Sequence, residues 1–497
     1  MPSSSRISTW LDSPTKLSMF RTTSELPATA DLAIIGSGLS GASVAYHALK
    51  TYSALSIVML EVGDVCEGAT GRTGGHLHPD FYTYASQVTA KYGPEEAVRL
   101  SKFERDNFEA VKRLIKEDNV YCETVEDGET WQVFLTQEEF SEALREFTMM
   151  RDLGGDVHDI QMYLRDEAIE VTGIQCCFGA ITRISNTEVL RVDLNNRSDA
   201  TPFSSGNCAA YDPELDEFEH VNMNPLRILP KKPSYLHKIT TSRGTLLANN
   251  VVHATNAYID TLLSISSNVC DTTKSRNGTV LVTPIRGHAL EIAPVGIQRK
   301  LSLDPSHNIT CMNFNSGGEY LIQRANGNFV LAGGRRFSKR KGIESFNNKT
   351  TTAETEIDGS VDLFLRFFFT QILCFDNSHY LSPPKLVFGE SDTNEAYSAD
   401  YRIVKQWTGI MGLSADEFLR GFPGHGMPRI FLAAKALVRM ILLEDDEYRY
   451  DCQYHSTIGP MHDGYLEGTI EIAENVQMPQ CFAITEERLT KMMNLLR

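Results

Sequence analysis

The chain has 497 residues, of which 42% are hydrophobic and 22% charged, and its formal net charge is −17. This length predicts two or three structural units, and the composition is ordinary for a globular protein. The negative charge disfavours nucleic acid and anionic membrane surfaces as partners, because phosphate groups would be repelled. No stretch reaches the roughly 18 apolar residues that a membrane span needs. The first 21 residues contain no continuous apolar core of a signal peptide, so we expect a cytoplasmic protein.

An N-terminal arm is followed by a strand–turn–helix–strand pattern over residues 31–61. Gly36, Gly38 and Gly41 punctuate the turn, and Glu61 ends the second apolar run. Glycine at these positions permits a tight turn, an approach of the backbone to pyrophosphate and close packing of the helix on the strand. A carboxylate about 20 residues later accepts the ribose hydroxyls and repels a 2′-phosphate, which disfavours NADP. This pattern predicts a dinucleotide site but does not distinguish FAD from NAD.

A glycine-dense loop at residues 68–76 follows, with Arg72 as its one fixed cation. Such a loop can pass close to a bulky flat ligand and place Arg72 near phosphate. Composition alone also fits an ordinary flexible loop.

The rest of the chain alternates between periodic segments and polar stretches. Apolar periodicity, turn residues and a capping-box pattern indicate the following order. We expect a helix at 93–117, a strand at 131–135, a helix at 136–150, a polar loop or disordered insert at 185–230, a hairpin at 235–240 and 245–255, strands within 279–294 and 319–337, a polar loop at 343–360 and a helix at 425–443.

Several blocks, taken in order, resemble the D-amino-acid-oxidase-type (DAO) superfamily of FAD-dependent oxidoreductases. The likeness is greatest to a fungal branch similar to γ-glutamylputrescine oxidase and sarcosine oxidase. The matching blocks are residues 36–41, Glu61, and residues 69–76, 251–258, 284–287, 319–324, 330–335, 407–412 and 424–428.

The resemblance implies an α/β fold in which a Rossmann-type FAD-binding domain is interleaved with an α+β substrate domain built on a mixed or antiparallel sheet. On this basis we expect an arm at 1–28, an FAD-binding domain at 29–92, 233–278 and 400–443, a substrate domain at 93–184 and 279–399, a polar insert at 185–232 and a C-terminal extension at 444–497.

The resemblance also implies the site residues. We expect the loop at 71–76 to run past the flavin ring and the last helix to meet the flavin with its N-terminus. The expected FAD contacts are Gly36, Gly38, Leu39, Ser40, Gly41, Glu61, Thr70, Gly71, Arg72, Gly74, Gly75, His76, Ala254, Thr255, Asn256, Gly424, His425, Gly426 and Met427. His76 and Arg286 are the candidate catalytic residues; the alternatives are a loop-packing histidine and a structural ion pair. Tyr258 and Tyr320 are predicted core residues.

Four departures from the family pattern affect the expected chemistry. Residues 413–423 are shorter than the family's turn and strand, and the polar stretch 185–230 stands where the family has a helix and a strand. No cysteine lies near Gly409, where some relatives attach the flavin, so we expect non-covalent FAD. The strand at 328–333 holds no lysine, which leaves oxygen as one possible acceptor among others.

The predicted function is oxidation of a small molecule by hydride transfer to flavin N5, at the C–N bond of an amine or amino acid. One alternative is flavin-dependent oxidation of an alcohol or sugar carbon, as in fungal secondary metabolism. The shortened segments motivate another, a weakly active or non-catalytic member of the family. The sequence shows no metal-binding arrangement, and a small-molecule substrate is the expected partner.

Overall fold

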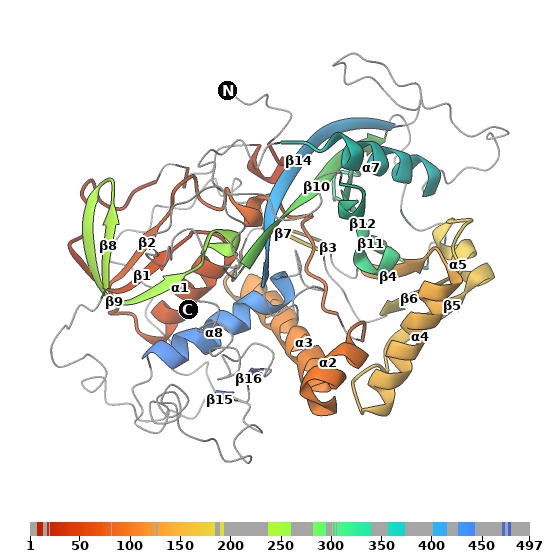
Figure 1. The fold of residues 1–497 in the computed structure, drawn as a ribbon, viewed down its shortest axis with the longest axis horizontal. Coiled ribbons are helices and arrows are strands. Elements are labelled where there is room, and N and C mark those ends of the chain that lie inside the picture. Colours follow the sequence, from red (N-terminus) through yellow and green to blue (C-terminus); the bar gives the residue numbers. More distant parts are fainter. Residues whose placement is uncertain are drawn as a thin grey trace, which may run out of the picture.

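A computed structural model of the chain describes residues 7–12, 17–18, 20–80, 82–120, 122–125, 128–183, 189–192, 237–259, 282–294, 301, 304, 306–338, 356–372, 401–414, 426–442, 470–472 and 476–478. Two sheets organise these residues, and the two longest strands, β10 (Val282–Pro294) and β14 (Tyr401–Ser414), lie at one edge of the larger sheet (Figure 1).

A four-stranded sheet forms the first unit. Its order is β2–β1–β9–β8, with β1 parallel to both β2 and β9, and β8 antiparallel to β9. The strands are β1 (Thr29–Ile35), β2 (Ile57–Leu60), β8 (His237–Thr241) and β9 (Gly244–His253). Because β1 lies inside the sheet, its second half, residues 32–35, is apolar on both faces. The predicted strand–helix–strand unit and the predicted hairpin are therefore confirmed.

Helices α1 (Leu39–Thr51) and α8 (Met427–Leu442) lie side by side against this sheet (Figure 1). Apolar residues of β1, α1, β9 and α8 share one core: Leu32, Ile34, Val44, Ala48, Val252, Ala434, Val438 and Leu442. Helix α3 (Pro94–Glu117) packs on the other side of α8, so the C-terminal helix is enclosed between two helices from the first quarter of the chain.

An eight-stranded sheet forms the second unit, in the order β14–β10–β13–β12–β11–β4–β6–β5. All neighbours are antiparallel except β11 and β4. The strands are β4 (Glu129–Phe134), β5 (Ile160–Leu164), β6 (Gly179–Arg183), β10 (Val282–Pro294), β11 (Ile309–Phe314), β12 (Glu319–Gln323), β13 (Phe329–Gly333) and β14 (Tyr401–Ser414). The mixed sheet implied by the sequence is present.

Helices cover this second sheet. Helices α5 (Arg165–Thr172) and α7 (Gly359–Ile372) contribute to its larger core, whereas α2 (Ala85–Tyr92) and α4 (Gln137–Asp152) pack with the start of α3 in a smaller one. The predicted helices at 93–117 and 136–150 are confirmed as α3 and α4. The Thr136 hydroxyl accepts a 3.2 Å hydrogen bond from the Glu139 amide, as the capping pattern predicts.

Short elements complete the described chain. Strand β3 (Cys122–Val125) pairs with β7 (Val189–Val192), and β15 (Ile470–Ile472) pairs with β16 (Val476–Met478). The 3-10 helices are Thr9–Leu11, Ala69–Arg72, Asn256–Tyr258, Asn315–Gly317 and Arg335–Phe337. Within the described residues no helix has the length and apolar character needed to cross a membrane.

Three features differ from the sequence prediction. In the predicted arm 1–28, Ser8 and Thr9 are buried. Strand β7 forms in the predicted polar insert, whose remaining residues lie outside the described chain. The segment 400–443, assigned wholly to the FAD-binding domain, supplies β14 to the eight-stranded sheet and α8 to the four-stranded one. β14 belongs to the eight-stranded sheet because it pairs with β10 along its length. The turn and helix signals that follow β14 in the sequence do not reveal this pairing.

Candidate functional site

The glycine turn between β1 and α1 is closely surrounded by backbone. Gly36 has a φ of 111°, and a Cβ added to it would overlap the carbonyl oxygen of Ala254. A Cβ added to Gly41 would likewise overlap the Gly36 carbonyl oxygen, and one added to Gly38 would lie 2.8 Å from the Thr70 hydroxyl. The turn therefore requires glycine for both conformation and packing.

Thr70 belongs to the glycine-dense loop at residues 68–76, called the flavin loop from here on, and connects it to helix α1. Its hydroxyl accepts a 2.9 Å hydrogen bond from the amide of Leu39, the first residue of the helix. First-turn amides have no partner within their own helix, so this hydroxyl acts as a cap supplied from elsewhere in the chain. Leu39 and Thr70, both predicted as cofactor contacts, are thus bonded to each other; Ser40 lies next to Leu39 in the same turn.

Glu61 lies just after β2, and its carboxylate is oriented by four hydrogen bonds. It accepts from the Ser37 amide at 2.8 Å, the Ser37 hydroxyl at 2.6 Å, and the amides of Val62 and Gly63 at 2.8 and 3.1 Å. Burial acts to raise the pKa of Glu61, but these hydrogen bonds outweigh it and hold the pKa below its usual value. The group is an ionised acceptor held beside the glycine turn.

Arg72 anchors the flavin loop to β14. Its Nε donates to the Glu67 carbonyl at 2.9 Å, and its Nη1 donates to the Thr408 carbonyl at 3.2 Å. In return, the Trp407 indole donates to the Arg72 carbonyl at 3.0 Å. These bonds fix the end of the 3-10 helix Ala69–Arg72 against the eight-stranded sheet, and the phosphate contact of Arg72 stays a prediction.

Aromatic rings crowd the glycines that follow. A Cβ added to Gly74 would lie 2.6 Å from the Tyr320 hydroxyl, and one added to Gly75 would lie 2.6 Å from the Trp10 ring. Tyr320 also contacts the His76 ring, with centroids 4.8 Å apart. Burial raises the pKa of Tyr320 to about 12, so its phenol stays protonated. These glycines therefore leave room for aromatic rings of the chain itself, and the approach of a flat ligand to the same loop stays a prediction.

The carboxyl end of β9 meets the glycine turn. The Ala254 amide donates to the Ile35 carbonyl at 2.8 Å. The Thr255 hydroxyl is buried and, among the described residues, has no hydrogen-bond partner. The Asn256 amide group donates to the Ile410 carbonyl at 2.7 Å and accepts from the Gly412 amide at 3.1 Å. Asn256 therefore fastens this edge of the parallel sheet to β14.

The start of α8 is held by α3. Gly426 accepts hydrogen bonds of 3.0 Å from the amides of the first turn, and the Met427 carbonyl accepts a 3.1 Å bond from the Asn107 side chain. The predicted contacts Gly424 and His425 lie outside the described residues.

Comparison with known proteins agrees with this geometry. Residues 31–191 match the family model described as "FAD dependent oxidoreductase", DAO. The matched segment contains the glycine turn, Glu61 and the loop at residues 68–76. The chain is also 28% identical over 95 residues to Gamma-glutamylputrescine oxidoreductase of Escherichia coli (strain K12). That match covers 19% of this chain and 22%, about a fifth, of the relative.

Solved structures extend the DAO-family likeness to the whole fold. Glycine oxidase from Geobacillus kaustophilus superimposes with a TM-score of 0.52 at 15% identity, over 84% of this chain and 95% of that one. L-amino acid deaminase from Proteus vulgaris gives 0.50 at 12% identity, over 85% and 96%. The described chain thus has the α/β fold of these two enzymes, with a Rossmann-type sheet.

The residues present fit FAD, the cofactor that the DAO family implies. The glycine turn leaves no room for side chains beside the N-terminus of α1, where phosphate groups are favoured by amide donors and the helix dipole. Glu61 is an ionised acceptor suited to ribose hydroxyls. The buried Thr255 hydroxyl needs a polar partner. These three features surround one end of β1.

Arg286 and His288 lie in β10 and are both buried. The Arg286 guanidinium is 3.5 Å from the Glu356 carboxylate, and the His288 Nε2 accepts a 2.9 Å bond from the Asp358 amide. Burial, with a smaller contribution from the positive charge of Arg286, lowers the pKa of His288 to about 4. The imidazole is therefore neutral. The two predicted catalytic residues have different partners, since Arg286 contacts the segment before α7 and His76 contacts Tyr320.

A buried polar group that the sequence patterns did not predict lies behind the start of α8. The Glu104 carboxylate pairs with the Arg429 guanidinium, and Asn107 accepts a 2.8 Å bond from the Leu432 amide. All three side chains are buried. Glu104 and Asn107 stand on the side of the predicted helix that also carries core residues such as Phe103. Polar residues at these positions were the sequence signal for the buried group.

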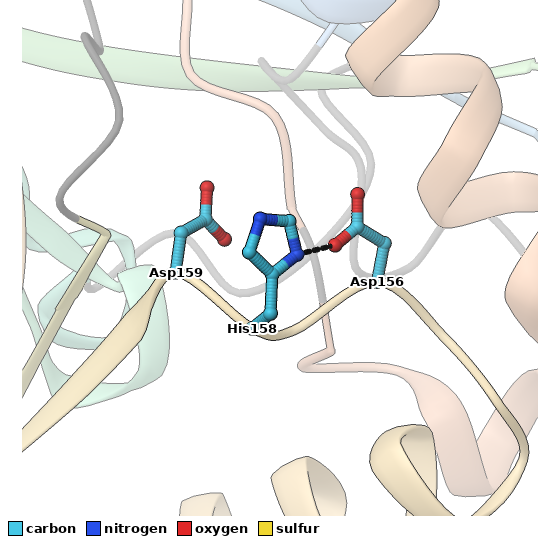
Figure 2. A group of neighbouring side chains, drawn as sticks. All are labelled: Asp156, His158 and Asp159. Atoms are coloured by element: carbon cyan, nitrogen blue, oxygen red, sulfur yellow. Dashed lines mark hydrogen bonds and ion pairs between the residues drawn. The ribbon is translucent and has the colours of Figure 1, made fainter.

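Asp156, His158 and Asp159 form a cluster before β5 whose ligand atoms lie within 4.8 Å of one another. Figure 2 shows His158 between the two aspartates and hydrogen-bonded to Asp156. Asp156 also pairs with Arg105, and Asp159 with Arg183. Because two arginines already balance these carboxylates, the cluster is an ion-pair network, and we assign it no metal.

Proposed function

We propose that the chain binds FAD non-covalently and oxidises the C–N bond of an amine or amino acid. The main support is that the glycine turn, the Glu61 carboxylate and the Thr255 hydroxyl lie together at one end of β1. The name of the 28% identical relative, Gamma-glutamylputrescine oxidoreductase, supports an amine substrate.

When bound, FAD supplies an acceptor for a hydride taken from a carbon that bears nitrogen. The substrate loses this hydride and one proton from nitrogen, and the resulting imine is hydrolysed by water to a carbonyl compound and an amine or ammonia. The protein orients the substrate and excludes water, so no strong base from a side chain is required.

Arg286 is the proposed binding residue for an anionic group of the substrate. Its support is a fixed positive charge on the buried side chain of a strand that matches the family's Pro-Val-Arg-Gly block. The neutral His288 beside it adds no competing charge. His76, which follows the two glycines of the loop and packs on Tyr320, is the proposed side chain next to the flavin.

The visible spectrum of the purified protein tests the cofactor. A yellow protein that releases intact FAD into solution on denaturation supports non-covalent binding. A colourless protein that gains no flavin absorbance when FAD is added would overturn the proposal.

Anaerobic reduction then tests the substrate class. Amines and amino acids should bleach the flavin, whereas polyols should not, and the carbonyl product should match the amine supplied. Bleaching by polyols alone would contradict the amine assignment while leaving the FAD assignment in place. An Arg286→Lys variant keeps the charge but changes the donor geometry, so it should raise KM for an anionic substrate with less effect on kcat.

A further inference from the structure

The N-terminal strap, defined as residues 8–12, lies directly on the flavin loop. The Ser8 hydroxyl donates to the Gly71 carbonyl, and the Trp10 indole donates a 2.6 Å hydrogen bond to the Thr73 carbonyl. A Cβ added to Gly71 would lie 2.7 Å from the Leu11 side chain. Ser8 is fully buried, so these are interior contacts that hold the loop by its backbone.

The other side of the strap contacts the eight-stranded sheet. Arg324, just after β12, donates to the Thr9 hydroxyl at 2.9 Å and places its guanidinium 5.1 Å from the centre of the Trp10 ring. The Trp10 and Trp407 rings meet edge to face at 6.4 Å. Asp12 forms an ion pair with Lys405 of β14. The strap therefore joins the loop to β14 and to the residue after β12 by contacts of different kinds.

The glycine-rich part of the loop gains order from the strap, in addition to the hydrogen bonds of Thr70 and Arg72. Gly71, Gly74 and Gly75 contribute no side chains, and glycine loses more conformational freedom than other residues when it becomes ordered. Gly75 also has a φ of 90°, a conformation that favours glycine, and the Trp10 ring leaves no room for a side chain at this position. Without the strap, the loop would keep the hydrogen bonds of Thr70 and Arg72, but the carbonyls of Gly71 and Thr73 would lose their partners in the strap.

We propose that the strap, and Trp10 above all, is a positioning element that holds the flavin loop in the conformation that binds FAD. The inference rests on the proposed function for the identity of the ligand. The contacts themselves involve only the chain, so the order of the loop can be measured separately from FAD binding.

The first experiment compares FAD affinity in the full chain and in Trp10→Ala, by titrating apoprotein and following the quenching of FAD fluorescence. We expect Kd to rise by about tenfold or more, since several loop residues must then be ordered on binding. Phe20→Ala is the matched control, because Phe20 is an aromatic residue of the same N-terminal segment and is 57% exposed. It should bind FAD as the wild type does.

The second experiment measures the loop directly in the apoprotein, by the rate of tryptic cleavage after Arg72. Trp10→Ala should be cleaved several-fold faster than the wild type, and Phe20→Ala at the wild-type rate. Trp10→Phe keeps an aromatic ring but loses the donor to the Thr73 carbonyl, so it should fall between the two.

The outcomes separate the strap from the proposed function. If the wild type binds no FAD, the proposed function fails, and the cleavage rates still decide whether the strap orders the loop. Wild-type affinity together with wild-type cleavage in Trp10→Ala would overturn the inference. If that variant does not fold, Trp10→Phe and Ser8→Ala take its place, and wild-type behaviour of both would overturn it equally.

Discussion

The buried pair of Glu104 and Arg429 offers a quantitative test of how α8 is held. Glu104 is fully buried and Arg429 is 5% exposed. Both Nε and Nη2 of Arg429 donate to one carboxylate oxygen, while the other accepts from the Asp80 amide. The change Glu104→Gln keeps the shape but leaves the guanidinium charge buried without an opposite charge. Loss of one partner of a buried pair costs about 3–5 kcal/mol, so we expect unfolding free energy to fall by that amount.

Urea unfolding followed by circular dichroism measures this loss. The matched control is Glu142→Gln, which breaks an exposed pair with Arg145 on α4 and should change stability by less than about 1 kcal/mol. The double change Glu104→Leu with Arg429→Met should recover most of the loss, because well-packed apolar residues can replace a buried pair. Equal effects of Glu104→Gln and Glu142→Gln would refute the reasoning.

Three further predictions concern the turn, the ribose acceptor and acid stability. Gly41→Ala should destabilise the chain by about 1–3 kcal/mol in thermal unfolding, because the new Cβ overlaps the Gly36 carbonyl; unchanged stability would contradict the crowding. Glu61→Gln should weaken FAD binding by about tenfold in the fluorescence titration, since neutral acceptors form weaker bonds, and retained affinity would remove Glu61 from the site. Burial lowers the pKa of both His47 and His288 to about 4. Each histidine therefore stays neutral in the folded protein, whereas in the unfolded chain it becomes protonated below a pH of about 6.5. Up to ~3 kcal/mol of folding stability per histidine is lost as the pH falls from there toward 4. Urea unfolding at a series of pH values should show a shallower acid loss in His47→Leu, and an identical slope would contradict this origin.

Local patterns were sufficient to predict the N-terminal unit. The apolar run before Gly36, the spacing to Gly41 and the acidic end of β2 at Glu61 are all encoded within about 30 residues. Strand and helix periods are properties of neighbouring residues, so a single sequence reveals them. The same holds for α3, α4 and the β8–β9 hairpin.

Contacts that close the site were not predictable in this way. Thr70 caps α1, Asn256 fastens β14, and Trp10 packs on Gly75, each through a polar or aromatic side chain far away in sequence. A single threonine, asparagine or tryptophan forms no periodic pattern in the sequence. The distant residue that it contacts therefore cannot be inferred from residue spacing. Trp10 did offer one signal, because it is one of only three tryptophans and stands in a segment rich in serine and threonine.

The place of β9 beside β1 has a consequence for biosynthesis. β1 emerges from the ribosome near the N-terminus, but its second partner is made roughly 200 residues later. At ~5–20 residues per second, this leaves β1 with one open edge for roughly 10–40 s. An apolar strand with unpaired backbone groups is a template for wrong pairing. The nascent chain must therefore protect that edge by other means, and slower translation before residue 244 should lower the yield of folded protein.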